Sequence, residues 1–166
     1  MRNWLVVAVL FVTACGDGAS PTSPSGEIAS FSWTVDGAAF QATSNGRAAA
    51  NVSGTLNIAG ADCSRGPTLN ILLRQAASTG TFSTGSGGVL EATWTPDART
   101  GSAAGTAFDA LGGTRGSGSL TLSEVSGTWV KGSFSLQMVA RPGQADQANK
   151  TVQGSFSLPL REVRVC

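Results

Sequence analysis

The sequence predicts an all-β protein with a single antiparallel β-sandwich or barrel-like domain. Apolar and polar residues alternate over short runs, and turn-forming residues return about every 8 to 14 positions, as in antiparallel sandwiches and barrels. No stretch of the β-rich region has a helical period, and none is long enough for the crossover helix of a parallel sheet.

The first predicted strand covers residues 29–35. Its sequence, ASFSWTV, places Ala, Phe, Trp and Val on one face and hydroxyl side chains on the other. Asp36 and Gly37 then form a two-residue type I′ turn signal, and the apolar pattern resumes over residues 39–42. We therefore expect a β-hairpin here.

Three further runs alternate in the same way. The first has Leu56 and Ile58 before an expected turn at Gly60. The second spans residues 68–74, with Leu69, Ile71 and Leu73 on one face. The third spans residues 89–94, with Leu90, Ala92 and Trp94 on one face.

A longer stretch, residues 95–118, is too long for a structureless connection in a compact domain. We expect a short strand within residues 105–110. Without that strand, the stretch would be the best candidate for a mobile binding loop.

The pattern Gly-x-Phe-Ser occurs at residues 80–83, 132–135 and 154–157. In a strand, residues two apart share a face, so each glycine is expected to lie inward beside an inward phenylalanine. There it allows a sharp bend or accepts a neighbouring ring over its backbone. A packing role is favoured over a repeated ligand-binding motif. Full alternation over residues 130–138 and 152–160 predicts the last two strands.

The N-terminus has a separate pattern. Arg2 precedes nine apolar residues, Trp4 to Val12, and the run ends at Val-Thr-Ala followed by Cys15. This resembles the signal peptide and lipobox of bacterial lipoproteins. The apolar run is about half of the roughly 20 residues that a spanning helix needs, and an ordinary secretory signal requires no cysteine at the cut. The resemblance implies cleavage before Cys15, acylation of Cys15 and anchoring to a membrane through its lipid.

The resemblance divides the chain into three parts. Residues 1–14 are the cleaved signal peptide, residues 15–27 are the lipidated cysteine with a flexible tether, and residues 28–166 are the all-β domain. It also implies a location in the cell envelope. In similar Gram-negative lipoproteins, Asp directly after the cysteine favours the inner membrane. Because Gly16 stands there, we expect the outer membrane if the host has two.

Acylation of Cys15 leaves two cysteines, Cys63 and Cys166. An exported location permits them to form a disulfide. The alternative is two free thiols.

Two longer segments resemble a group of bacterial β-rich lipoprotein domains of unknown function. They are SWTVDGAAF at residues 32–40 and GSLTLSEVSGTWVKGSFSLQM at residues 118–138. The likeness extends over about residues 29–160 and mostly reflects turns and core positions. It implies an exported, membrane-anchored all-β domain and supplies no catalytic residues.

Candidate catalytic groups are few because the chain has no histidine. Ser-His-Asp and Cys-His mechanisms and histidine-ligated zinc are thereby excluded. A glycan hydrolase with two carboxylates remains possible, and the acidic residues of the folded region that we considered for this role are Asp62, Glu91, Asp97, Asp109 and Glu124. We expect all five at solvated surface or turn positions.

No metal or cofactor site is expected. The spacing of a calcium loop is missing, and Gly112–Gly118 is not followed by a helix as a phosphate cradle requires, so it is predicted to be a loop. Removing residues 1–14 deletes Arg2 and leaves ten basic against ten acidic residues. A neutral chain with 13% charged residues lacks the basic surface that nucleic acid requires.

Among the aromatic residues, Trp33 and Trp94 are expected in the core and Trp129 on the outside. Alternation back from Phe134 places Val130 inward and Trp129 outward with Lys131. An exposed tryptophan could stack on a sugar ring or anchor a protein partner. The alternative is that a β-bulge or a covering loop buries it.

These observations favour a membrane-anchored envelope lipoprotein with a non-catalytic binding or structural module. Its partner would be an envelope protein, a glycan or a small hydrophobic ligand. A lipocalin-like carrier is the alternative and would need an internal apolar cavity. A carboxylate-dependent glycan hydrolase comes third. The oligomeric state is not predicted.

Overall fold

The computed structural model describes residues 26, 28–43, 47–64, 66–85, 88–96, 108–110, 115–143 and 148–160. These residues form eleven strands in one curled sheet and no helix, which confirms the all-β prediction. None of them belongs to a helix long and apolar enough to span a bilayer. The strands are β1 (Ser30–Val35), β2 (Ala38–Gln41), β3 (Arg47–Val52), β4 (Thr55–Ala61), β5 (Thr68–Leu73), β6 (Gly80–Ser83), β7 (Leu90–Thr95), β8 (Phe108–Ala110), β9 (Ser117–Val125), β10 (Trp129–Ala140) and β11 (Lys150–Pro159).

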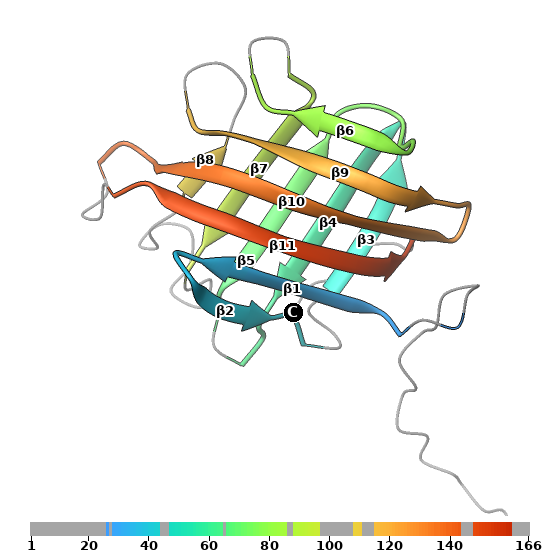
Figure 1. Cartoon of the computed structure of the whole chain (residues 1–166), viewed down its shortest axis with the longest axis horizontal. Coiled ribbons are helices and arrows are strands. Elements are labelled where there is room, and N and C mark those ends of the chain that lie inside the picture. Colours follow the sequence, from blue (N-terminus) through green and yellow to red (C-terminus); the bar gives the residue numbers. More distant parts are fainter. Residues whose placement is uncertain are drawn as a thin grey trace, which may run out of the picture.

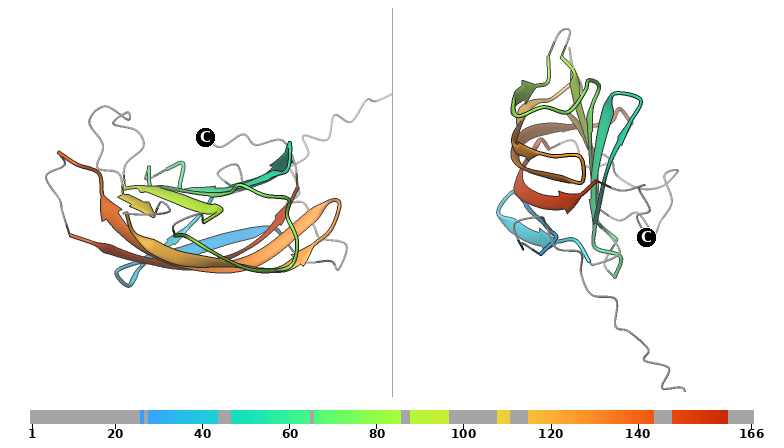
Figure 2. Two further views of the ribbon diagram at one scale, coloured as in Figure 1. Left: turned by 90° about the horizontal axis from the view of Figure 1, so that it is seen from above. Right: turned by 90° about the vertical axis from the view of Figure 1, so that its right-hand side faces the viewer.

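The sheet curls into two layers that face each other (Figures 1 and 2). Layer 1 has the strand order β2-β1-β11-β10-β9-β6, and layer 2 has the order β7-β5-β4-β3. The short strand β8 joins them because it pairs with β7 and with the end of β10. On the opposite side, an isolated parallel bridge links Ala49 of β3 to Leu160 after β11. All strand pairs are antiparallel, and the shape is that of a half-barrel.

The predicted first hairpin is present. β1 and β2 pair in register around Asp36 and Gly37, whose φ values of 49° and 86° are both positive, as a type I′ turn requires. The alternation of β1 is also confirmed: Phe31, Trp33 and Val35 are buried and the intervening Ser32 is exposed.

The core lies between the two layers. Aromatic rings fill its centre: the ring of Phe31 lies 5.5 Å from that of Trp33, 5.8 Å from that of Phe134 and 6.0 Å from that of Phe156, measured between centroids. Aliphatic side chains from both layers surround them, and Trp94 is buried as predicted.

The two C-terminal Gly-x-Phe-Ser motifs interlock across β10 and β11. Gly132 pairs with Phe156, and Phe134 pairs with Gly154. A methyl group on Gly132 would lie 2.9 Å from Phe156 Cζ, and one on Gly154 would lie 2.6 Å from Phe134 Cζ. Each ring therefore covers the opposite glycine, which confirms the packing interpretation. Gly80 differs: it is exposed because β6 is an edge strand.

The expected turn at Gly60 is wrong, because β4 continues through that residue to Ala61. A methyl group there would lie 2.5 Å from Phe31 Cδ1, so this glycine makes room for the ring of a facing strand. The glycine is a packing site inside a strand, and its local sequence resembles a turn.

Two other expectations change at the junction of the layers. The short strand expected within residues 105–110 is confirmed as β8, Phe108–Ala110. The predicted loop Gly112–Gly118 is partly wrong, because β9 begins at Ser117; residues 112–114 lie outside the described part of the chain. The sequence also missed β3, an alanine-rich strand joined to β4 by Ser53 and Gly54 with positive φ.

Candidate functional site

The outer face of layer 1 is lined with short hydroxyl and amide side chains. Inward residues of its strands fill the core, so strand alternation sends the intervening polar residues outward. We call this surface the hydroxyl face. Its members are Ser30, Ser32, Thr34, Gln41, Thr81, Ser83, Ser117, Ser119, Thr121, Ser133, Ser135, Gln137, Thr151, Gln153 and Ser155.

One row of this face crosses all six strands of layer 1 without interruption. Each member pairs directly with the next, in the order Thr81, Thr121, Ser133, Ser155, Ser32 and Gln41. At about 4.8 Å between strands, the row is about 24 Å long. It is therefore a continuous line of groups that can both donate and accept hydrogen bonds.

The middle of the row has hydroxyl groups available to a ligand. Ser32, Ser133 and Ser155 are exposed and make no side-chain hydrogen bond to another described residue. The end of the row is different, since Thr81 and Thr121 hydroxyl oxygens are hydrogen-bonded to each other at 3.0 Å.

Charges near this face occur in pairs of opposite sign. Lys131 Nζ lies 3.5 Å from Glu124 Oε2, and Lys150 Nζ lies 3.6 Å from Asp36 Oδ2 at the rim. The face is therefore close to neutral, which suits a neutral ligand better than a charged one.

The hydroxyl face has a hollow of about 690 Å³ near the start of β10. Gly132, Ser133 and Ser155 line it, together with Lys131 and the exposed Ile28. The hollow therefore lies where two of the available hydroxyl groups of the row, those of Ser133 and Ser155, reach the surface.

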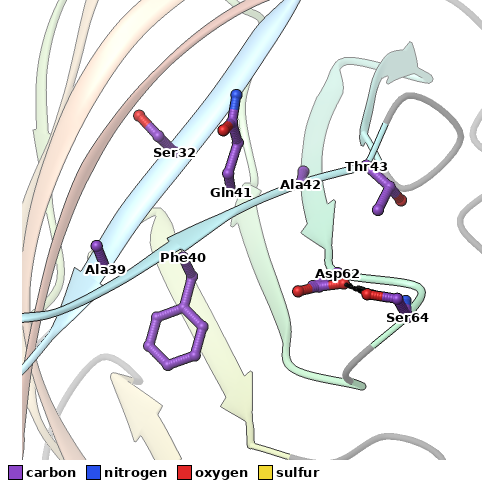
Figure 3. A pocket seen from close by; sticks show the side chains of 8 residues that line it. All are labelled: Ser32, Ala39, Phe40, Gln41, Ala42, Thr43, Asp62 and Ser64. Atoms are coloured by element: carbon purple, nitrogen blue, oxygen red, sulfur yellow. Dashed lines mark hydrogen bonds between the residues drawn. The ribbon is translucent and has the colours of Figure 1, made fainter.

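A second groove, of about 630 Å³, lies where β2 faces the turn after β4 (Figure 3). Ser32 and Gln41 of the row line it, together with Phe40, Asp62 and Thr43. The Thr43 amide donates to Ala61 O at 3.0 Å, which joins the end of β2 to β4. The row therefore runs from the hollow at Gly132 to this groove.

Asp62 keeps the turn beside the groove in shape. Its Oδ1 accepts hydrogen bonds from the Ser64 amide at 3.0 Å and the Ser64 hydroxyl at 2.5 Å. This arrangement is an Asx turn, so the expected turn position of Asp62 is confirmed. The ring of Phe40 stacks on Trp33 with centroids 5.6 Å apart and closes the core below the groove.

The expected exposure of Trp129 is wrong: its side chain is 2% exposed. Alternation does separate it from Val130, which belongs to the core cluster while Trp129 does not. The indole Nε1–H donates to the Ser157 hydroxyl oxygen at 3.0 Å, so the ring lies against β11 instead of projecting into solvent. Trp129 is therefore not available to stack on a ligand.

Asp109 is the acidic residue whose expected surface position is wrong. It is 1% exposed and lies at the junction of the layers, on β8. Arg141 donates to it twice, from Nε at 2.8 Å and from Nη2 at 3.0 Å, and Thr93 Oγ1 donates at 3.1 Å. Arg115 Nη1 lies 3.9 Å away. The hydrogen bond to Asp109 raises the pKa of Arg141.

Two other carboxylates lie on the surface in ion pairs, as expected. Arg74 contacts both Glu91 oxygens at 2.9 Å, which raises the pKa of Arg74, and Glu124 faces Lys131. Asp97 lies outside the described residues. Within the described ranges, no three His, Cys, Asp or Glu side chains gather as a metal site would require.

The cysteines are described only in part. Cys63 is half-buried in the turn after β4, between Asp62 and Ser64 beside the groove. Cys15 and Cys166 lie outside the described residues, so the lipidation and the disulfide stay predictions.

Comparisons with models of protein families, with curated proteins and with solved structures each found no match.

Proposed function

We propose that this chain is an envelope lipoprotein, held in the membrane by lipid on Cys15, whose β domain binds a neutral glycan on the hydroxyl face without catalysing a reaction. The supporting observation is the row of paired hydroxyl and amide side chains from Thr81 to Gln41, with available hydroxyls at its centre. Sugars present the same groups, so a glycan lying along the row exchanges hydrogen bonds with water for equivalent bonds with protein.

The membrane anchor is supported by residues 1–15, where a short apolar run ends at a lipobox-like cysteine. The polar residues that follow, up to residue 27, would let the domain stand off the membrane by a distance on the order of 20 Å. Gly16 favours the outer membrane in a host that has two. A glycan of the envelope would then be within reach.

A binding role is favoured over the carrier and the hydrolase. A carrier needs an apolar cavity, and here the rings of Phe31, Phe134 and Phe156 occupy the space between the layers. A hydrolase needs two cooperating carboxylates. Asp109 is held by arginine, and Glu91 and Glu124 are engaged in ion pairs.

The test uses the mature chain with Cys15→Ser, which removes the lipid, and a soluble neutral β-glucan as the probe. We expect binding that changes little with salt, because no charge is involved. A chain that also has Ser32→Ala, Ser133→Ala and Ser155→Ala should bind at least tenfold more weakly, since each hydrogen bond contributes about 0.5–1.5 kcal/mol.

The matched control changes exposed polar residues of the other layer, Asn51→Ala and Asn70→Ala, and should bind as the parent does. Equal binding by the serine variant and its parent would show that the glycan does not use the hydroxyl face. Binding to an anionic polysaccharide alone would contradict the neutral ligand.

A further inference from the structure

The charged side chains at the junction of the layers are not balanced one to one. Asp109 on β8 has two arginines beside it, because Arg141 Nε lies 2.8 Å and Arg115 Nη1 lies 3.9 Å from its Oδ2. On the surface of layer 2, by contrast, Arg74 and Glu91 pair as one cation with one carboxylate. Among the described residues, the junction therefore carries one positive charge more than Asp109 neutralises.

Asp109 does not need Arg115 as a partner. Both of its carboxylate oxygens accept hydrogen bonds from Arg141, whose Nε and Nη2 donate at 2.8 Å and 3.0 Å, and Thr93 Oγ1 donates at 3.1 Å. A bidentate pair with arginine neutralises the carboxylate. At 3.9 Å, Arg115 lies beyond hydrogen-bond distance of Asp109. It therefore adds a charge at the junction without adding a hydrogen bond to the buried carboxylate.

The backbone holds Arg115 at this place. The next residue, Gly116, has a φ of 67°, in the left-handed region. A methyl group on Gly116 would lie 2.5 Å from Gln137 O, 2.7 Å from Asp109 O and 2.9 Å from Ala110 Cα. The chain therefore packs directly against β8 and β10 here, and a side chain at position 116 would force it away. This close contact sets the position of Arg115 beside Asp109.

The two guanidinium groups are close together and reach solvent. Arg141 Nε and Arg115 Nη1 lie near the same oxygen, so they are at most about 7 Å apart. Their side chains are 48% and 35% exposed, whereas that of Asp109 is 2% exposed. Like charges at this separation repel each other, and an anion beside both of them offsets the repulsion. Arg141 uses two of its five N–H groups on Asp109, so the others can donate to such an anion.

We propose that Arg115 and Arg141 form a binding site for an oxyanion, the carboxylate or phosphate group of a ligand. A planar guanidinium can donate two parallel hydrogen bonds to either group, and the positive charge in excess of Asp109 attracts both. Asp109 fixes the orientation of Arg141 from the buried side. The exposed sides of the two arginines are left to contact the ligand.

This site is separate from the row on the hydroxyl face. Arg141 follows the end of β10 (Figure 1), eight positions after Ser133, which is about 26 Å along an extended strand. A neutral glycan on the row does not contact these arginines. The anion site is therefore independent of glycan binding, and the failure of either proposal leaves the other intact.

Isothermal titration calorimetry tests the site, with the mature Cys15→Ser chain as the parent and inorganic phosphate and acetate as probes at equal ionic strength. We expect the parent to bind at least one of these anions at a single site. Arg115→Gln should weaken this binding at least tenfold, because it removes one guanidinium and leaves the pair of Arg141 and Asp109 in place. Tighter binding of phosphate would assign a phosphate group as the ligand, and tighter binding of acetate would assign a carboxylate.

The matched control is Arg74→Gln. It changes the net charge by the same amount, but the arginine that it removes is paired with Glu91. This variant should bind the probes as the parent does. Equal weakening by the two variants would indicate general attraction of anions to the protein and would overturn the proposal. A parent that binds neither probe would also overturn it, because the charge at the junction would then already be balanced.

Discussion

Replacing Gly154 with alanine tests the interlocked glycine and phenylalanine pairs of β10 and β11. The new methyl group would meet Phe134 Cζ at 2.6 Å, Trp33 Cα at 2.9 Å and the Ser32 carbonyl oxygen. Two of these three atoms belong to the backbone of β1, so a rotamer change alone cannot relieve the overlap. Overpacking of a core typically costs about 1–3 kcal/mol, and we expect the upper end, about 3 kcal/mol.

The measurement is urea unfolding of the mature chain with Cys15→Ser, followed by tryptophan fluorescence. For a domain of this size, about 3 kcal/mol corresponds to a fall in Tm of roughly 10 °C. Gly127→Ala is the matched control, because no atom lies within 4 Å of the position that its methyl group would occupy and its φ is not in the left-handed region. It should unfold within about 0.5 kcal/mol of the parent. If Gly154→Ala did the same, the close packing described for these strands would be refuted.

Three further predictions concern the corrected or untested residues. Asp109→Asn should lower the free energy of unfolding by about 2 kcal/mol, because the two charge-assisted hydrogen bonds to Arg141 weaken. Glu91→Gln, which weakens the exposed ion pair with Arg74, should lower it by less than about 1 kcal/mol. Equal losses for the two variants would contradict the buried role of Asp109. Trp129→Phe should lower the free energy of unfolding by about 1 kcal/mol, because it removes the hydrogen bond to Ser157. Urea unfolding measures this change, and an unchanged midpoint would show that the hydrogen bond contributes nothing to stability. Cys15→Ser should move the protein from the membrane fraction to the soluble fraction and abolish palmitate incorporation, and Cys63→Ser should change neither; a labelled, membrane-bound Cys15→Ser chain would exclude the anchor.

Local patterns were enough to predict the strands that alternate strictly. β1 and its turn at Asp36 and Gly37 follow from side-chain period and turn chemistry within about ten residues. The covering of Gly132 and Gly154 by phenylalanine could also be anticipated, because glycine and ring recur two positions apart. β3 could not, since a run of alanines has low strand propensity and joins the sheet through its neighbour β4.

The predictions that were wrong concern residues whose surroundings depend on another residue far away in the sequence. Gly60 looked like a turn, but the ring of Phe31 passes over it. Trp129 faces away from the core cluster as alternation predicts, and a hydrogen bond to Ser157 nevertheless holds it buried. Asp109 has no local signal of burial, because Arg141 is 32 positions away.

From the sequence, only the residue composition of the candidate site could be predicted. Repeated Ser-x-Ser patterns around Phe31, Phe134 and Phe156 indicate one polar face per strand. That these faces align into one row depends on the order and register of six strands, which pairing across the whole chain determines.

The position of β10 in the sheet determines how the domain unfolds. Its twelve residues pair with β11 on one side and with β9 and then β8 on the other, so the same strand belongs to both layers. Neither layer can separate without breaking hydrogen bonds of this strand. The domain should therefore open as one cooperative unit, and amide hydrogens in the middle of β5 and of β11 should exchange with solvent through the same global unfolding event.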